Sequence, residues 1–293
     1  ISSVYDNWQE LLEDPSIDAI CIGTWPYMHR TLTLAALEAG KHVLCEARMA
    51  TCALEAQEML DASRERPDLI SQIVPSPLTF KIDRLLQGKI AEGYIGDIIG
   101  VSVQSLGNAF MDQGGPMHWR NDRDLSGFNI MNMGIWYEAM IRWVGRATKV
   151  TAMTKVTVNT RKDEDGESVD VNIPDHVGII AELANGAMAN MQFSAVTGLS
   201  SGNGVWIYGS EGTLHVDGAQ NVYGGRRGDD KLAEIENPEA GRAYWRVEEE
   251  FCSAIRGQEK ITRTPFEVGL HYMEFTEAVT RSAQTGQTVA LPL

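Results

Sequence analysis

The first hundred residues alternate apolar, strand-like runs with helix-like runs, and this alternation constrains the fold more than any other feature. Residues 17–23 (IDAICIG) are almost continuously apolar, as expected for a strand buried on both faces of a sheet. Residues 27–41 follow with an apolar stripe at helical spacing and Gly40 at the helix end, and residues 42–45 (HVLC) have the character of a second strand. Such repeats predict right-handed crossovers and a doubly wound parallel sheet.

The pattern changes near residue 97, where strand-like segments begin to follow one another. A helix is expected over residues 126–144, and Asn185-Gly186 is a strong hairpin signal between two of the later extended segments. We therefore predict an α+β region with an open, mostly antiparallel sheet and helices on one face. The chain divides into residues 1–96 and residues 97–293.

The composition of the chain argues against some classes of binding partner. The formal net charge of -15 over 293 residues repels phosphate backbones and anionic lipids, so we expect neither a nucleic-acid nor a membrane partner. No apolar run approaches the roughly 18 to 20 residues that span a bilayer. The four cysteines form no CxxC pair and no His/Cys/Asp cluster has metal-ligand spacing, which predicts a reduced, cytoplasmic protein without a metal site.

Four segments together carry a resemblance to known proteins. They are residues 5–50, GYIGDIIGVSV (93–103), GSEGTLHVDG (209–218) and GQTVALPL (286–293). The chain resembles the glucose-fructose oxidoreductase and inositol dehydrogenase (Gfo/Idh/MocA) family over essentially its whole length. The resemblance implies that residues 1–96 are the C-terminal part of a Rossmann domain that binds NAD or NADP. It also implies that residues 97–293 supply a sugar or polyol site and a homo-oligomer interface on their sheet.

The glycine-rich turn that binds a dinucleotide pyrophosphate is absent from this sequence. Gly114-Gly115 and residues 202–204 contain glycines, but neither stretch follows a buried strand and opens a helix. The resemblance therefore implies two further strand-helix units upstream of Ile1, roughly 60 residues at about 30 per unit. We expect the sequence to be a fragment, because a naturally short protein would leave a sheet edge exposed to aggregation.

The stretch GKHVLCEARMA (40–50) departs from the family at the position that handles protons. In the family a Glu-Lys-Pro tripeptide ends this strand, and its lysine helps move the hydroxyl proton. Here Glu46 matches, while the next two residues are Ala47 and Arg48. A guanidinium is a poor base, but Arg48 could polarise a carbonyl or bind a carboxylate. The alternative is that Arg48 caps the strand end or pairs with Glu46.

A second family pattern, Asp-x-Gly-x-His, is also altered. Gly134 matches, but Asn132 occupies the aspartate position and Trp136 the histidine position. Tyr137 and Glu138, next along the predicted helix, are candidate substitutes for the missing acid-base groups.

Each of these candidates has a structural alternative. Glu138 and Arg142 are four residues apart and could form a helical surface pair, worth about 0.2–0.5 kcal/mol. Trp136 and Trp143, one heptad apart, could belong to the core.

Residues 116–124 (PMHWRNDRD) resemble the family's Trp-Arg segment, which approaches cofactor and substrate. His118 is the strongest candidate for displaced acid-base work, and Trp119 and Arg120 are expected beside the cofactor. The alternative for Arg120 is a salt bridge with Asp122 inside the loop.

Thr24, Pro26 and His29 match the family loop that lies along the nicotinamide, with the alternative that His29 caps its helix. The resemblance thus implies an NAD(P)-dependent oxidoreductase that acts on a secondary alcohol of a sugar, polyol or glycoside. Because the proton-handling groups differ, a non-redox sugar-binding or regulatory protein of the same fold is the alternative.

Overall fold

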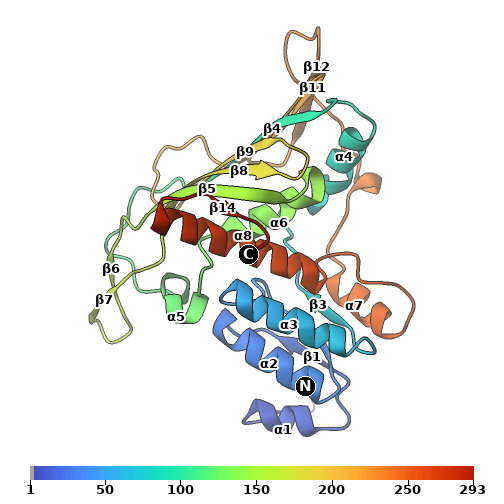
Figure 1. The fold of residues 1–293 in the computed structure, drawn as a ribbon, viewed down its shortest axis with the longest axis vertical. Coiled ribbons are helices and arrows are strands. Elements are labelled where there is room, and N and C mark those ends of the chain that lie inside the picture. The colour runs from blue at the N-terminus through green and yellow to red at the C-terminus, as the bar shows by residue number, and fades with distance from the viewer. Residues whose placement is uncertain (1–2) are drawn as a thin grey trace.

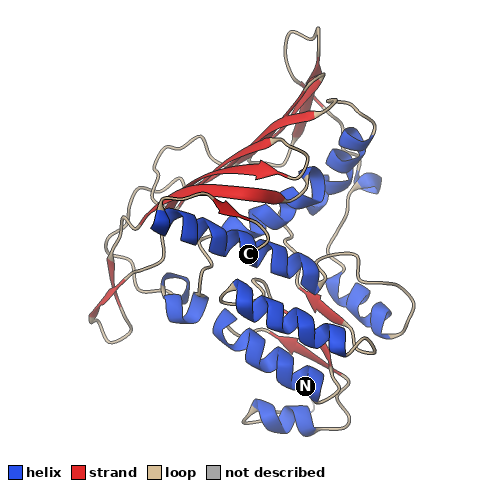
Figure 2. Cartoon of the chain, in the orientation of Figure 1, coloured by secondary structure: helices blue, strands red, loops and turns tan. Residues whose placement is uncertain are grey.

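Two main sheets separated by helices make up the structure, a computed structural model that describes residues 3–293 (Figures 1 and 2). The smaller sheet is parallel, with strand order β1-β2-β3. The α/β architecture predicted from the alternating pattern is therefore confirmed. The strands and their crossover helices are β1 (Ala19–Ile22), α2 (Pro26–Glu38), β2 (His42–Cys45), α3 (Ala53–Glu65) and β3 (Ser71–Ile73).

One detail of the first strand differs from the prediction. Ile22 is buried, but Cys21 is exposed, so residues 17–23 are not covered on both faces. Helix α7 (Val247–Ile255) packs over Leu44 on one face of this sheet and leaves Cys21 uncovered. The apolar run correctly indicated a strand and overestimated its burial.

The larger sheet has nine strands in the order β13-β12-β11-β10-β4-β9-β8-β5-β14. Only β4 and β9 pair in parallel, and the other neighbours are antiparallel, which confirms the predicted mostly antiparallel sheet. Gly186, with φ of 83°, lies in the predicted turn between β8 and β9. The strands are β4 (Ile98–Leu106), β5 (Ala147–Lys155), β8 (His176–Leu183), β9 (Met188–Ser194), β10 (Gly204–Gly209), β11 (Gly212–Val216), β12 (Val222–Arg226), β13 (Ala233–Glu234) and β14 (Val289–Ala290).

Helices cover one face of the large sheet and connect it to the parallel layer (Figure 1). Helix α8 (Phe266–Thr285) packs on β5, on β3 and on α3, so it contacts both layers. Helix α4 (Phe80–Ala91) follows the parallel strands in sequence but packs against α6. The remaining elements are α1 (Trp8–Glu13), α5 (Arg123–Ser126), α6 (Met133–Val144) and a ribbon of β6 (Thr160–Lys162) and β7 (Ser168–Asp170).

The helix predicted over residues 126–144 is interrupted. Helix α5 ends at Ser126, and α6 begins only at Met133. Gly127 and Met131 between them adopt positive φ values of 64° and 45°, which a continuing helix does not allow. The interruption places Asn132 at the N-terminus of α6. Gly134, in the first turn of this helix, lies against Arg48 in the loop after β2.

Candidate active site

The buried side chain of His29 contacts both the loop after β1 and the loop after β2. His29, on α2, has its Nδ1 3.0 Å from the carbonyl oxygen of Arg48 and its Nε2 2.9 Å from that of Thr24. Burial lowers the pKa of His29, and the contacts with the carbonyl groups oppose this effect in part. The alternative that His29 caps its helix is wrong, because the helix begins at Pro26 without a side-chain cap.

Two tryptophans join the β1 loop to the segment that precedes α5. The rings of Trp25 and Trp119 stack with centroids 5.9 Å apart and planes 19° from parallel. The guanidinium of Arg120 lies over Trp119, 4.0 Å from the ring centroid. His118 accepts a hydrogen bond at Nδ1 from the backbone N–H of Arg120 at 3.2 Å. Partial burial and the Arg120 charge lower the pKa of His118.

The proposed salt bridge between Arg120 and Asp122 does not form. Among the ion pairs of residues 3–293, none includes Arg120. Asp122 accepts a hydrogen bond from the backbone N–H of Asp124 at 2.9 Å and caps α5. Arg120 is therefore held by its contact with the Trp119 ring and by no ion pair within the described residues.

Arg48 reaches inward from the end of β2 and is only 5% exposed. It does not pair with Glu46, whose exposed carboxylate accepts a hydrogen bond from the Ala47 N–H at 3.3 Å. Burial lowers the pKa of Arg48 to about 10, Tyr272 opposes the shift, and Arg120 adds to it. Arg48 and Arg120 are thus close enough to repel one another.

The N-terminus of α6 lies against Arg48. A Cβ atom added at Gly134 would lie 2.9 Å from Arg48 Cδ, so glycine leaves the room that the arginine side chain fills. Asn132 is partly buried, and its Nδ2 donates a hydrogen bond to Ser105 Oγ at 2.7 Å. Trp136, further along the helix, is buried in the core, as its structural alternative predicted.

Tyr137 and Glu138 point into different surroundings from those loops. The Tyr137 hydroxyl accepts a hydrogen bond from the Ala147 N–H at 2.9 Å, and its ring stacks on Phe275 with centroids 3.7 Å apart. Burial raises the pKa of Tyr137 well above its ordinary value. These contacts support a structural role for Tyr137.

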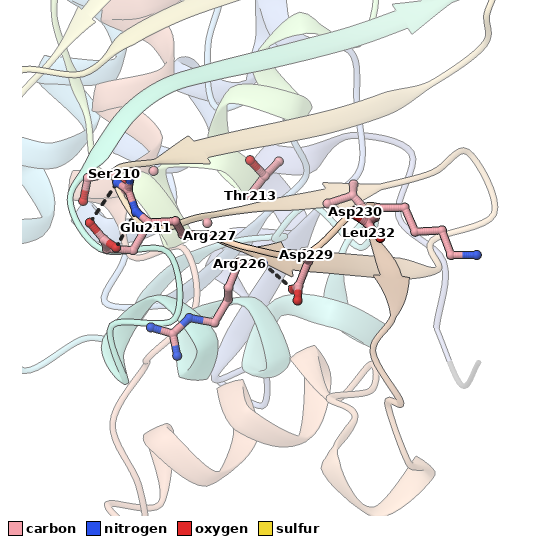
Figure 3. Close-up of a pocket in the computed structure, with 12 residues that line it drawn as sticks. Ser210, Glu211, Thr213, Arg226, Arg227, Asp229, Asp230 and Leu232 are labelled. Carbon is pink, nitrogen blue, oxygen red and sulfur yellow. Dashed lines mark hydrogen bonds and ion pairs between the residues drawn. The ribbon is translucent and has the colours of Figure 1, made fainter.

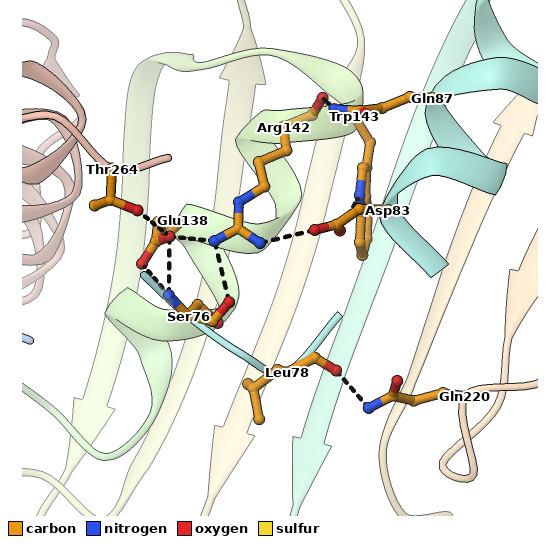
Figure 4. Close-up of polar contacts among 9 residues, drawn as sticks. All are labelled: Ser76, Leu78, Asp83, Gln87, Glu138, Arg142, Trp143, Gln220 and Thr264. Atoms are coloured by element: carbon orange, nitrogen blue, oxygen red, sulfur yellow. Dashed lines mark hydrogen bonds and ion pairs between the residues drawn. The ribbon is translucent and has the colours of Figure 1, made fainter. Parts of the chain in front are cut away.

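Glu138 lies in a paired cluster of buried charges (Figure 4). Its carboxylate accepts hydrogen bonds from the Ser76 N–H at 2.9 and 3.0 Å and from Thr264 Oγ1 at 2.9 Å, and it forms an ion pair with Arg142. Arg142 also contacts Asp83 at 2.9 Å. Burial raises the pKa of Glu138, while Arg142 and the hydrogen bonds oppose the rise. The predicted surface pair exists but is buried, since Glu138 is 1% exposed.

Three side chains contribute to this region that the sequence analysis did not name. Trp25 stacks on Trp119, Ser105 holds Asn132, and Tyr272 accepts a hydrogen bond from the backbone N–H of Met49 at 2.6 Å. Only Trp25 had a local signal, its position beside Pro26. The other two come from distant elements, β4 and α8, and only the folded chain brings them here.

Cavities elsewhere in the molecule have different chemistry. One of about 480 Å³ lies at the far end of the large sheet, where Arg227 pairs with Glu211 at 3.2 Å (Figure 3). Another, of about 680 Å³, lies between α4, α6 and α8 and includes Arg142. Within residues 3–293 no group of three His, Cys, Asp or Glu side chains is arranged to hold a metal ion. In the same part of the chain, no helix is both long and apolar enough to cross a membrane.

A parallel α/β layer joined through helices to an open, mostly antiparallel sheet is the architecture of the two-domain oxidoreductases with a Rossmann fold. The family model described as "Oxidoreductase family, NAD-binding Rossmann fold" matches residues 1–72. The "GFO/IDH/MocA C-terminal domain" matches residues 84–215. The chain belongs to the Gfo/Idh/MocA family.

Curated relatives carry the names of dehydrogenases. Levoglucosan dehydrogenase of Pseudarthrobacter phenanthrenivorans is 24% identical over 224 residues, 71% of this chain and 57% of the relative. Trans-1,2-dihydrobenzene-1,2-diol dehydrogenase of Bos taurus is 27% identical over 216 residues, 74% of this chain and 59% of the relative. The matched region therefore spans less than two thirds of the length of these relatives.

Solved structures share the fold over nearly the whole chain. Levoglucosan dehydrogenase in complex with NADH and levoglucosan gives a TM-score of 0.86 at 21% identity, covering 99% of this chain and 84% of that one. The WlbA dehydrogenase from Bordetella pertussis, in complex with NADH and UDP-GlcNAcA, gives 0.75 at 20% identity, covering 98% and 83%. At these identities the likeness establishes the fold alone.

Proposed function

We propose that the protein is an NAD(H)-dependent dehydrogenase that interconverts a secondary alcohol of a sugar or polyol and the corresponding ketone. The observation that carries this proposal is the convergence of an aromatic stack, two arginines, an imidazole and Asn132 at the carboxyl ends of β1 and β2. Ligands of open α/β sheets bind at this edge. The names of the relatives and the NADH complexes of similar structures support the same class of reaction.

The residues at this edge fit the nicotinamide end of a dinucleotide. Thr24 lies in the loop before α2, and its carbonyl group contacts His29; Pro26 is the first residue of that helix. Glu46 is exposed at the end of the neighbouring strand. Trp119, stacked on Trp25, would form the wall beside the ring. A bound NAD or NADP would supply the hydride chemistry, so the chain itself has to orient the substrate and handle the proton.

Proton handling falls to His118 in this proposal. Its lowered pKa leaves the imidazole neutral near pH 7. The base would be Nδ1, which has to exchange its hydrogen bond from the Arg120 N–H for one from the substrate hydroxyl, because Nε2 carries the ring proton while Nδ1 accepts. Arg48 would polarise the oxygen or hold an acidic group, and Asn132 would donate or accept a hydrogen bond. Tyr137 and Glu138 act as structural supports, because their polar atoms already have buried partners.

The proposed homo-oligomer interface is the outer face of the large sheet. Met153, Ile180, Met188 and Tyr208 come from β5, β8, β9 and β10, lie on one face by strand register, and are all exposed. An apolar row of this kind is typical of a surface that a second subunit covers.

Turnover with a panel of neutral sugars, polyols and sugar acids tests the proposed reaction. We expect reduced nicotinamide to appear when NAD or NADP and the right substrate are present, and His118→Asn to lower kcat by about 100-fold or more. Glu58→Gln, which alters only a surface ion pair, is the matched control. Sugar binding without any nucleotide binding, by a protein that includes the strand-helix units expected upstream, would instead establish the non-redox alternative.

A further inference from the structure

The side chain of Arg48 fills a narrow channel between Gly134 and Thr276. Its aliphatic part passes Gly134 at the start of α6, next to the Thr276 methyl group on α8. A Cβ atom at position 134 would approach Arg48 Cδ to 2.9 Å and Thr276 Cγ2 to 3.3 Å. The guanidinium is therefore held in one place by packing and is not a mobile surface group.

The charge at the end of this side chain has no acidic partner among residues 3–293. No carboxylate lies within the 4.0 Å that defines an ion pair, and Nε is fully buried without a hydrogen-bond acceptor. The acidic residue nearest in sequence, Glu46, faces solvent. Burying an isolated cation is costly, so a guanidinium in this position requires an anion from elsewhere.

A second cation, Arg120, adds to the lowering of the Arg48 pKa. Arg120 is exposed, is held over the Trp119 ring and, like Arg48, forms no ion pair within the described chain. The sequence contains 40 acidic residues against 25 basic ones, yet no carboxylate neutralises these two arginines. The other titratable groups that face them are the phenol of Tyr272 and the imidazole of His118, and neither supplies a negative charge near neutral pH.

We infer that the substrate of this site is a sugar acid, an aldonate or uronate, whose carboxylate binds the buried guanidinium of Arg48, with the exposed Arg120 adding positive charge. This inference rests on the proposed function, because it places the acid in the same site. A planar guanidinium matches the two oxygens of a carboxylate, whereas a neutral sugar would leave the buried positive charge of Arg48 uncompensated. The carboxylate anchors one end of the substrate and leaves a ring hydroxyl for the reaction.

Equilibrium binding measures this inference without requiring turnover. Calorimetric titration of the full chain with D-glucuronate and D-gluconate should give Kd values at least about 10-fold lower than with D-glucose or myo-inositol. Arg48→Gln, which removes the charge and leaves a shorter polar side chain, should weaken the acids by about 10- to 100-fold and leave the neutral sugars nearly unchanged. Arg48→Lys should recover part of the difference, and Arg30→Gln on α2 is the charge-matched control.

Three results would overturn the inference. Equal affinities of wild type for acids and neutral sugars would remove its basis, and so would unchanged acid binding by a folded Arg48→Gln protein. Inorganic phosphate that binds more tightly than either sugar acid and competes with them would show that the arginines bind a phosphate, such as one of the cofactor. The proposed function fails separately: sugar-acid binding without nucleotide reduction would refute the dehydrogenase, while neutral-sugar turnover unaffected by Arg48→Gln would retain it and refute the sugar acid.

Discussion

Arg142, a partly buried residue of α6, and Arg48, a buried residue next to that helix, have opposite surroundings. Arg142 contacts both Glu138 and Asp83, and the cluster also uses the Ser76 N–H (Figure 4). Arg48 is more deeply buried than Arg142 and has no acidic partner in the described chain. A charge that is fully paired inside the protein supports the fold, whereas one left without a partner is available to a ligand. The sequence motifs placed Arg48 and Glu138 in the same candidate site. Their surroundings distinguish a charge that supports the fold from one that is available to a ligand.

The largest effect is expected from breaking the paired cluster. Glu138→Ala leaves Arg142 and the Ser76 N–H without their main acceptor, which should lower the free energy of unfolding by about 3–5 kcal/mol. Urea unfolding monitored by tryptophan fluorescence measures this. Glu58→Ala, in an exposed pair with Arg30, should cost at most about 1 kcal/mol. Equal costs for the two variants would mean that the Glu138 cluster is not a structural support.

The unpaired arginine should respond in the opposite direction. Arg48→Met removes an uncompensated buried charge and keeps most of the side-chain volume, so the unliganded protein should become more stable by about 1–4 kcal/mol. The same urea experiment measures the gain, and sugar-acid binding should be lost together with the charge. A loss of stability comparable to that of Glu138→Ala would assign Arg48 to the structure and end the contrast.

Much of the fold could be predicted from the sequence, but little of the difference between the surroundings of Arg142 and Arg48 could. Hydrophobic periodicity and the Asn185-Gly186 turn are local signals, and they predicted both sheets correctly. The partners of Glu138 are 62 and 126 residues away in the chain, so its spacing from Arg142 indicated the pair but not its burial. Burial is decided by which elements pack together, and no local pattern contains that information.

The site itself shows the same division. The tripeptide ending in Arg48 and the segment around Arg120 were recognisable, because each is a short continuous stretch. That Arg48 is buried without a carboxylate, and that the charge of Arg120 acts on it, became visible only in the folded chain. The stack of Trp25 on Trp119 likewise depends on two loops that meet only after folding.

The channel at Gly134 allows a smaller test of how firmly Arg48 is held. Gly134→Ala places a methyl group 2.9 Å from Arg48 Cδ and should lower the free energy of unfolding by about 1–3 kcal/mol. Shortening the partner in the double variant Gly134→Ala with Arg48→Ala should recover most of that cost, a coupling that chemical denaturation of all four proteins measures. If the two single effects simply add, Arg48 does not fill the channel and the guanidinium is free to move.

The smallest expected effect is on how the free energy of unfolding depends on pH. This dependence comes from His29, which contacts the backbone carbonyl of the unpaired Arg48. Burial lowers the folded-state pKa of His29 below its ordinary 6.5, so the unfolded chain binds the proton more readily. The contribution of His29 to stability is therefore complete above pH 6.5 and decreases as the pH falls through the window between 6.5 and the folded-state pKa. Each unit of difference between the two pKa values contributes about 1.4 kcal/mol.

Unfolding free energies measured between pH 8 and pH 5 for wild type and His29→Asn test this expectation. The variant should be less stable at pH 8, because it loses the hydrogen bond that the single N–H of the neutral imidazole donates to a carbonyl group of Thr24 or Arg48, and its stability should fall less steeply on acidification. Parallel curves would show that His29 keeps its proton when folded, held by the two carbonyl groups. A second buried cation would then lie beside Arg48, in addition to the exposed Arg120, and the site would favour an anionic ligand even more strongly.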